Sequence, residues 1–215
     1  MTLPNNDTGV RPQAMFSLFR KKPSSIPLEE QLKALADCGV TLSPEATVND
    51  LFMFHSREEH EATPYKELIP TLGFEMERDS FAPICNRLWM CDYERVEDHG
   101  AYADVITRLQ QMTEESLPIS GITDHVDVEA ETAWVEFDLA GSRIHWDAKV
   151  DDDWLDPYIV IKFDSLLKTH KTPFRIYSNH TDFGQSAFFA CFTPAEFERF
   201  QKLATFKLVG IEKQA

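Results

Sequence analysis

Apolar and polar residues alternate along much of the second half of the chain, which is typical of β-strands with one buried face. The clearest example is residues 132–150, where Trp134–Leu139 and Arg143–Val150 flank a short turn at Ala140-Gly141-Ser142. This segment predicts a β-hairpin, and we expect the hairpin to be central to a mainly antiparallel sheet. Further strands are expected over residues 88–96, 122–128, 174–177, 185–192 and 206–211.

Helical spacing of apolar residues dominates the first half of the chain. A helix is predicted between Pro27 and Gly39, because proline suits the first helical turn and glycine commonly follows the last one. A longer helix is predicted after Asp98, with an apolar stripe from Tyr102 to Met112. We expect the Asp98 carboxylate to cap the first turn of this helix. Shorter helical segments are expected after Thr47 and over residues 64–73.

Two helices in the second half are predicted from the residues that begin them. Asp156-Pro157 places a capping side chain and a proline before Tyr158–Lys168. The run Ile159-Val160-Ile161 in this segment would also suit a strand, but the wider apolar spacing favours a helix, which we predict. Thr193-Pro194 opens the last helix in the same way.

These elements predict an α+β fold, in which helices pack on a mainly antiparallel sheet. No Gly/Ser-rich or Pro-rich linker divides the chain after residue 26. We therefore expect residues 27–215 to form a single domain, helix-rich over residues 27–117 and sheet-rich over residues 118–215. Residues 1–26 have the polar, proline-containing composition of a flexible N-terminal tail.

The charge balance restricts the class of partner. The chain has 21 basic and 36 acidic residues, a formal net charge of −15. This balance argues against nucleic-acid binding and against binding to anionic membrane surfaces, and it favours a basic protein partner. No apolar run is long enough to span a bilayer, so a cytoplasmic protein is expected. The composition predicts no particular oligomeric state.

The densest charge feature is an acidic corner after the predicted hairpin. It contains Asp151, Asp152, Asp153 and Asp156, with Trp154 among them. Clustered carboxylates with an exposed tryptophan would suit a surface that binds a basic partner. Clustered oxygen ligands also suit a divalent cation, but the spacing is not that of an EF-hand loop. Capping of the following helix would account for part of the acidic charge without any ligand.

Other candidate chemistry is sparse. His145 and Asp147 share one face of a predicted strand and could form an acid–base pair, but no third group or cleft accompanies them in the sequence. The chain has no Gly-x-Ser-x-Gly motif and no phosphate-binding glycine loop. The four cysteines have neither Cys-x-x-Cys nor zinc-finger spacing, so buried, reduced thiols are expected. We therefore predict no catalytic residue and no cofactor.

The order of elements over residues 146–198 resembles a known bacterial pattern. An aromatic strand leads to Asp-Trp-Leu-Asp-Pro at residues 153–157, then to a helix that ends with Leu166-Leu167. A strand at 174–177, Gly184-Gln185 before an apolar strand, and Thr193-Pro194 before a last helix complete the order. This order resembles the C-terminal part of poorly characterised bacterial α+β proteins, some of them similar to immunity proteins that neutralise polymorphic toxins.

The resemblance covers about a quarter of the chain and carries no catalytic residue. It implies a binding role in a bacterial cell. Together with the charge balance, it leads us to expect a non-enzymatic binding protein whose acidic surface covers a basic partner, such as a toxin. The alternative is a divalent-metal-dependent enzyme that uses the acidic cluster at 151–156.

Overall fold

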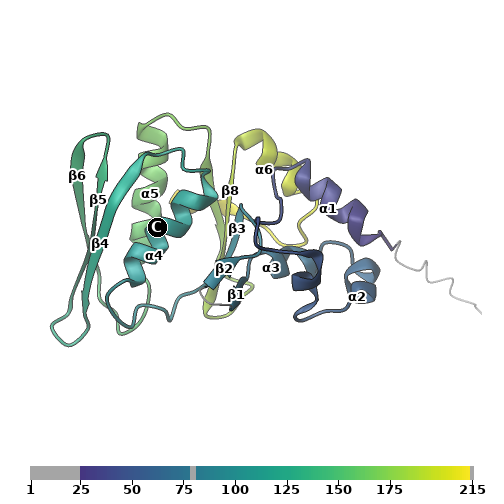
Figure 1. The fold of residues 1–215 in the computed structure, drawn as a ribbon, viewed down its shortest axis with the longest axis horizontal. Coiled ribbons are helices and arrows are strands. Elements are labelled where there is room, and N and C mark those ends of the chain that lie inside the picture. The colour runs from purple at the N-terminus through teal and green to yellow at the C-terminus, as the bar shows by residue number, and fades with distance from the viewer. Residues whose placement is uncertain (1–24, 78–80, 214–215) are drawn as a thin grey trace, which may run out of the picture.

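The computed structural model describes residues 25–77 and 81–213 (Figure 1). Most of the predicted flexible tail over residues 1–26 therefore lies outside the described residues. Ile26, at the end of that segment, donates its backbone N–H to the carbonyl oxygen of Glu61 at 3.2 Å.

The described residues form six α-helices and nine strands. The helices are α1 (Leu28–Ala36), α2 (Arg57–Ala62), α3 (Leu68–Leu72), α4 (Ala101–Met112), α5 (Pro157–Thr169) and α6 (Pro194–Phe200), with short 3-10 helices η1 (Val48–Phe52) and η2 (Ile211–Lys213). The strands are β1 (Glu75–Glu77), β2 (Phe81–Pro83), β3 (Leu88–Asp92), β4 (Ile119–Asp127), β5 (Thr132–Leu139), β6 (Ser142–Ala148), β7 (Arg175–Asn179), β8 (Ser186–Phe192) and β9 (Val209–Gly210).

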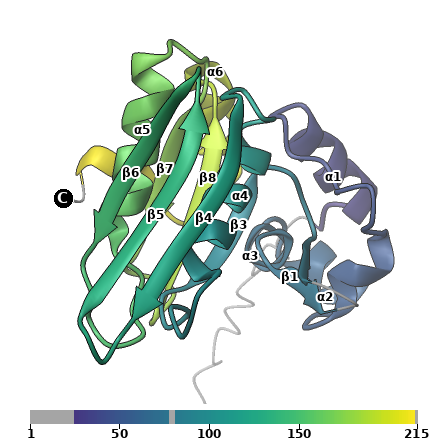
Figure 2. The ribbon, with the colours of Figure 1, turned by 60° about the vertical axis from the view of Figure 1, so that its left-hand side comes forward.

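Sheets and helices alternate in layers across the molecule. A three-stranded antiparallel sheet, in the order β4-β5-β6, forms one outer layer, and α4 and α5 lie behind it (Figures 1 and 2). The four-stranded antiparallel sheet, in the order β3-β8-β7-β9, follows, and α1, α3 and α6 lie on its far side. The predicted α+β class with antiparallel pairing is thus confirmed.

Strand β8 lies between two apolar cores. Phe189 and Cys191 point into the core that contains α4, α5 and the three-stranded sheet. Phe188 and Phe192 point into the core on the other side, with residues of α1, α3 and α6. Because successive side chains of a strand face opposite sides, an uninterrupted apolar run is what a strand covered on both faces requires.

The hairpin predicted over residues 132–150 is formed by β5 and β6. Leu139 pairs with Ser142, so the turn consists of Ala140 and Gly141, whose φ angles are 51° and 82°. Positive φ angles at both central residues are typical of a type I′ turn, whose backbone matches the right-handed twist of the two strands that it joins. β5 is the middle strand of its own sheet, but this sheet is an outer layer of the molecule, and the strand covered on both faces is β8.

Local capping signals located two helices correctly. Residues 158–168, whose sequence suits a strand or a helix, lie in α5, as predicted. The Asp156 side chain accepts the N–H of Tyr158 at the start of this helix. Helix α6 begins after Thr193, whose hydroxyl accepts the N–H of Glu196 while the Glu196 carboxylate accepts the N–H of Thr193.

The predicted cap of α4 was wrong. The helix begins after Gly100, and the Asp98 carboxylate accepts the N–H of the neighbouring His99, which precedes the helix. The cap comes instead from β4, where the Asp124 carboxylate accepts the backbone N–H groups of Gly100 (2.7 Å), Tyr102 (2.8 Å) and Ala103 (3.1 Å). A carboxylate at this point satisfies amides that have no partner within the helix and opposes the positive end of the helix dipole.

Candidate functional site

The acidic corner connects β6 to α5, and its residues differ in exposure. The side chains of Asp151 and Asp152 are exposed and Asp153 is half-buried. Trp154 is 39% exposed, whereas the next residue, Leu155, is buried in the core beneath it. Four of the five residues proposed from the sequence as a binding site are therefore at least partly accessible.

Asp156, the fifth proposed residue, points inward. It is only 8% exposed, and its carboxylate accepts the backbone N–H groups of Lys149 (2.9 Å) and Tyr158 (2.9 Å). These bonds close the loop and cap α5. Asp156 thus shapes the corner but does not belong to its exposed surface.

A second acidic segment, residues 92–98, lies against the corner. The N–H of Leu155 donates to the carbonyl of Tyr93 at 2.8 Å, and the N–H of Val96 donates to the carbonyl of Asp153 at 2.8 Å. This pairing places four more exposed carboxylates beside the corner. They belong to Asp92, Glu94, Glu97 and Asp98.

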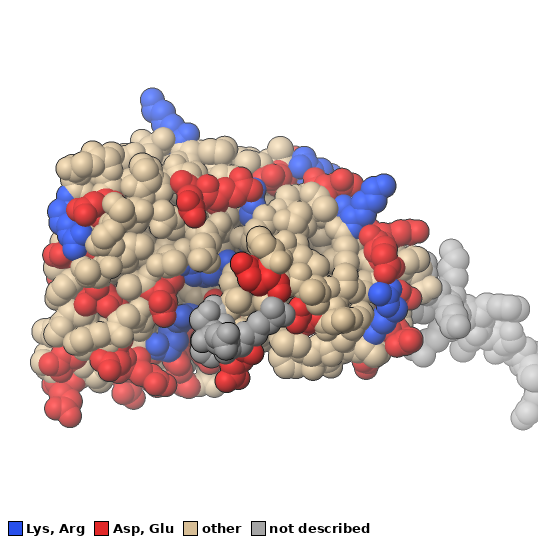
Figure 3. Space-filling view, viewed as in Figure 1, with Lys and Arg blue, Asp and Glu red and all other residues tan. Residues whose placement is uncertain are grey.

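We call residues 92–98 and 151–154 together the acidic end. The positive charges in and beside the acidic end do not offset this acidity. Lys149 forms an ion pair with Asp151 at 2.8 Å, and the Arg95 guanidinium turns inward over the Trp89 ring at 5.0 Å. Figure 3 shows acidic side chains gathered along the lower edge of the molecule, on the side of the three-stranded sheet. The acidic end therefore keeps a strong negative charge at its surface.

Two adjoining pockets lie beside Trp154. One, of about 280 Å³, is lined by Trp154 and Lys149, and the other, of about 510 Å³, is lined by Tyr158 and His180. Both pockets are also lined by Tyr93 and Pro157, and we call the two neighbouring pockets together the groove. Trp154 and Tyr158, at 39% and 54% exposure, are among the few large hydrophobic side chains that the described residues expose. The groove therefore combines aromatic rings with the acidic end.

The groove contains an uncharged hydrogen-bonded pair. The Tyr93 hydroxyl lies 2.6 Å from Nδ1 of His180, and the planes of the two rings are nearly parallel. Burial raises the pKa of Tyr93 and lowers the pKa of His180. Both shifts favour the neutral forms. The pair therefore offers an apolar surface with one polar contact and adds no charge that would cancel the acidic end.

His145 lies on the outer face of the three-stranded sheet, between two carboxylates. Its Nε2 is 3.0 Å from Asp147, the predicted partner, and its Nδ1 is 2.8 Å from Glu136. Sequence reasoning missed Glu136, which the register places directly opposite His145 on β5. Hydrogen bonds to Glu136 and Asp147 raise the pKa of His145. They favour the protonated ring, which suits an ion pair better than a general base.

A metal site needs several ligands directed at one point. Within residues 25–77 and 81–213, no group of three or more His, Cys, Asp or Glu side chains is arranged to hold a metal ion. All four cysteines are buried and unpaired.

Comparison of the chain with protein-family models, with curated proteins and with solved structures finds no match. No helix of the described part of the chain has both the length and the apolar character needed to cross a membrane.

Proposed function

We propose that this protein is a non-enzymatic binding protein whose acidic end covers a basic surface of a protein partner. The observation that carries the proposal is the position of Trp154. This exposed ring lies beside a groove and among carboxylates from two chain segments that backbone hydrogen bonds hold together. Exposed aromatic rings often anchor protein interfaces, and charged side chains around them can form a polar rim.

The charges and the rings would contribute differently. Carboxylates of one sign speed the encounter with a cation-rich partner and disfavour acidic competitors. Tryptophan and tyrosine gain most when a partner covers them, because they bury a large area and lose little conformational entropy. The arrangement supports fast association through the acidic end and slow dissociation through Trp154 and Tyr158.

The specific role that we propose is inhibition of a basic toxin in a bacterial cell, in the manner of an immunity protein. This role draws on the resemblance of residues 146–198, which include the acidic corner, α5 and β7. An inhibitor of this kind needs a preformed surface and no chemistry of its own. The backbone bonds that join residues 92–98 to the corner supply such a surface.

The test is a retention experiment with the immobilised chain in a native lysate at low and high salt. A basic protein should be retained at low salt and released at high salt, because interactions between exposed charges are screened. The triple variant Glu97→Gln/Asp151→Asn/Asp152→Asn and the single variant Trp154→Ala should each weaken binding of the purified partner by about tenfold or more, about 1.4 kcal/mol.

The matched control removes the same charge elsewhere. Glu30, Glu115 and Glu198 are exposed and lie outside the acidic end. Changing all three to Gln should leave binding within about twofold of the wild type, since charge far from an interface contributes little at physiological salt. Equal loss in both triple variants would show that net charge alone attracts the partner. If Trp154→Ala retains the partner as well as the wild type does, the proposed site is wrong.

A further inference from the structure

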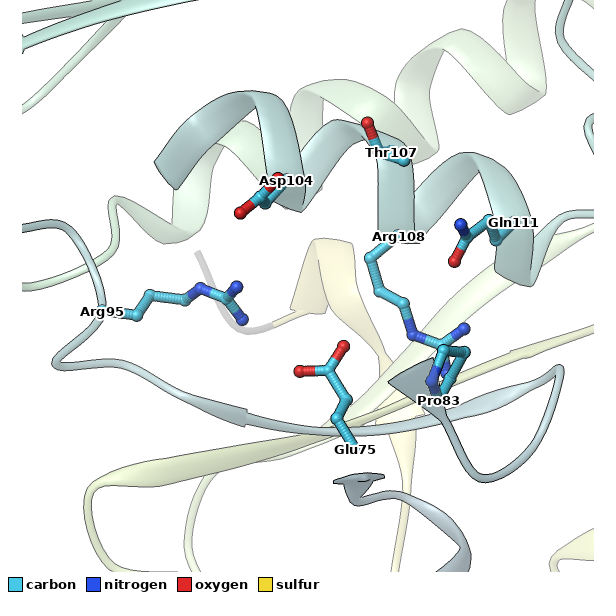
Figure 4. A pocket seen from close by; sticks show the side chains of 7 residues that line it. All are labelled: Glu75, Pro83, Arg95, Asp104, Thr107, Arg108 and Gln111. Atoms are coloured by element: carbon cyan, nitrogen blue, oxygen red, sulfur yellow. The ribbon is translucent and has the colours of Figure 1, made fainter. Parts of the chain in front are cut away.

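A third pocket lies between α4 and the β1–β2 hairpin (Figure 4). Its volume is about 380 Å³, within the range of small-molecule sites. The charged and polar side chains that line it include Glu75, Arg95, Asp104, Thr107, Arg108 and Gln111.

Arg108 is a buried cation with unused hydrogen-bond donors. The residue is only 4% exposed, and its Nη2 donates to the carbonyls of Cys85 (3.0 Å) and Leu88 (2.7 Å). Its Nε and Nη1 are buried and have no partner. A buried guanidinium normally has an anionic partner, because removing the charge from water is costly. Two carbonyl groups leave much of that cost uncompensated.

Arg95 enters the same pocket from the loop after β3. Its guanidinium lies over the Trp89 ring, Nη1 is 3.8 Å from the Cys91 sulfur, and its buried Nε has no partner. Three other arginines, Arg57, Arg87 and Arg143, each have a carboxylate within 4.0 Å. Among the described residues, neither Arg95 nor Arg108 has one. Both arginines of the pocket thus lack the carboxylate partner that Arg57, Arg87 and Arg143 possess.

The pocket also contains negative groups. Figure 4 shows the Arg95 and Arg108 side chains on either side of Glu75, with Asp104 above on α4. Two guanidinium groups and two carboxylates leave the lining without formal net charge. A simple anion would pair with the arginines but would be repelled by Glu75 and Asp104. A ligand that carries charges of both signs would satisfy all four groups.

We propose that this pocket binds a free α-amino acid. The ligand carboxylate pairs with Arg95 and Arg108, and the ammonium group pairs with Glu75 and Asp104. Thr107 and Gln111 offer a hydroxyl and an amide to the remaining polar atoms. The site goes beyond the proposed protein-binding role and does not depend on it.

The test is calorimetric titration of the full chain at neutral pH with each of the twenty encoded amino acids. At least one should give saturable heat and raise the melting temperature. The N-acetyl derivative and the amide of that amino acid each lack one charge, so each should bind about tenfold more weakly or worse. Acetate and inorganic phosphate serve as anion-only probes and should give no saturable heat. Failure of all twenty amino acids, or equally tight binding of phosphate, would overturn the proposal.

Variants locate the binding site. Asp104 is exposed and Arg95 is half-buried, so Asp104→Asn and Arg95→Gln should fold, and each should weaken binding about tenfold. The matched control, Asp152→Asn, removes an exposed carboxylate outside the pocket and should bind the amino acid as the wild type does. If Asp104→Asn and Arg95→Gln both bind normally, the pocket is not the site. Because Asp152→Asn is part of the triple variant that tests the acidic end, the two proposals can fail separately.

Discussion

Asp124 should stabilise the fold more than any other single carboxylate contact described above. Its side chain accepts three backbone N–H groups at the start of α4, at 2.7 to 3.1 Å. Loss of a helix cap costs about 0.5–2 kcal/mol, and a hydrogen bond to a charged group contributes about 1.5–3 kcal/mol. The three bonds share one carboxylate, and water can reach part of the helix start. The total contribution is therefore smaller than the sum of three separate hydrogen-bond energies. We expect Asp124→Ala to lower the free energy of unfolding by about 3 kcal/mol.

Urea unfolding followed by tryptophan fluorescence measures this loss directly. In a chain of this size, 3 kcal/mol corresponds to a fall in melting temperature of about 6–12 °C. Asp124→Asn keeps an acceptor but loses the charge, so it should retain part of the stability. The matched control is Asp98→Ala, which removes the residue that the sequence favours as the cap. Its exposed side chain should contribute within about 0.5 kcal/mol of zero. Equal losses in Asp124→Ala and Asp98→Ala would refute the assignment of the cap.

Three further predictions concern the core, the outer sheet and the thiols. Phe189→Ala should lower the free energy of unfolding by about 3–5 kcal/mol in urea denaturation, and a loss below about 1 kcal/mol would contradict its placement in the core. Hydrogen bonds to Glu136 and Asp147 raise the pKa of His145 above 6.5. The resulting stabilisation is complete below pH 6.5 and is lost as the pH rises through the folded-state pKa. An NMR titration of the imidazole should therefore show a higher pKa in the wild type than in Glu136→Gln. Burial raises the pKa of Cys91 to about 12. Its thiol should therefore react with iodoacetamide at pH 8 only after denaturant is added, as mass spectrometry of the labelled peptide would show.

Local signals in the sequence were sufficient for the class of fold and for several element boundaries. The side chains that begin α5 and α6 are adjacent in sequence to the amides that they cap, so Asp156-Pro157 and Thr193-Pro194 located both starts. The alternation around Ala140-Gly141 located the hairpin for the same reason. Each of these signals depends only on residues a few positions apart.

Features that depend on distant residues could not be predicted. Asp124 caps a helix that begins more than twenty residues earlier, and no local pattern relates it to Gly100. The sequence predicts a strand over residues 88–96, but β3 ends at Asp92, and residues 93–96 pair with residues 153–155. The sequence predicts two roles for Asp156: it could cap the helix that follows, or it could belong to the exposed acidic corner. The structure uses it as the cap, because its two backbone donors lie within reach of its buried carboxylate.

The position of β8 has a consequence for recognition. One strand supplies aromatic side chains to both interiors, so an opening motion that loosens either interior disturbs the other as well. Local breathing should therefore be confined to loops without such support, while the corner that carries Trp154 stays rigid because backbone hydrogen bonds join it to residues 93–96. A partner that docks there would meet a surface already in its bound shape and would spend little of its interaction energy on ordering this chain.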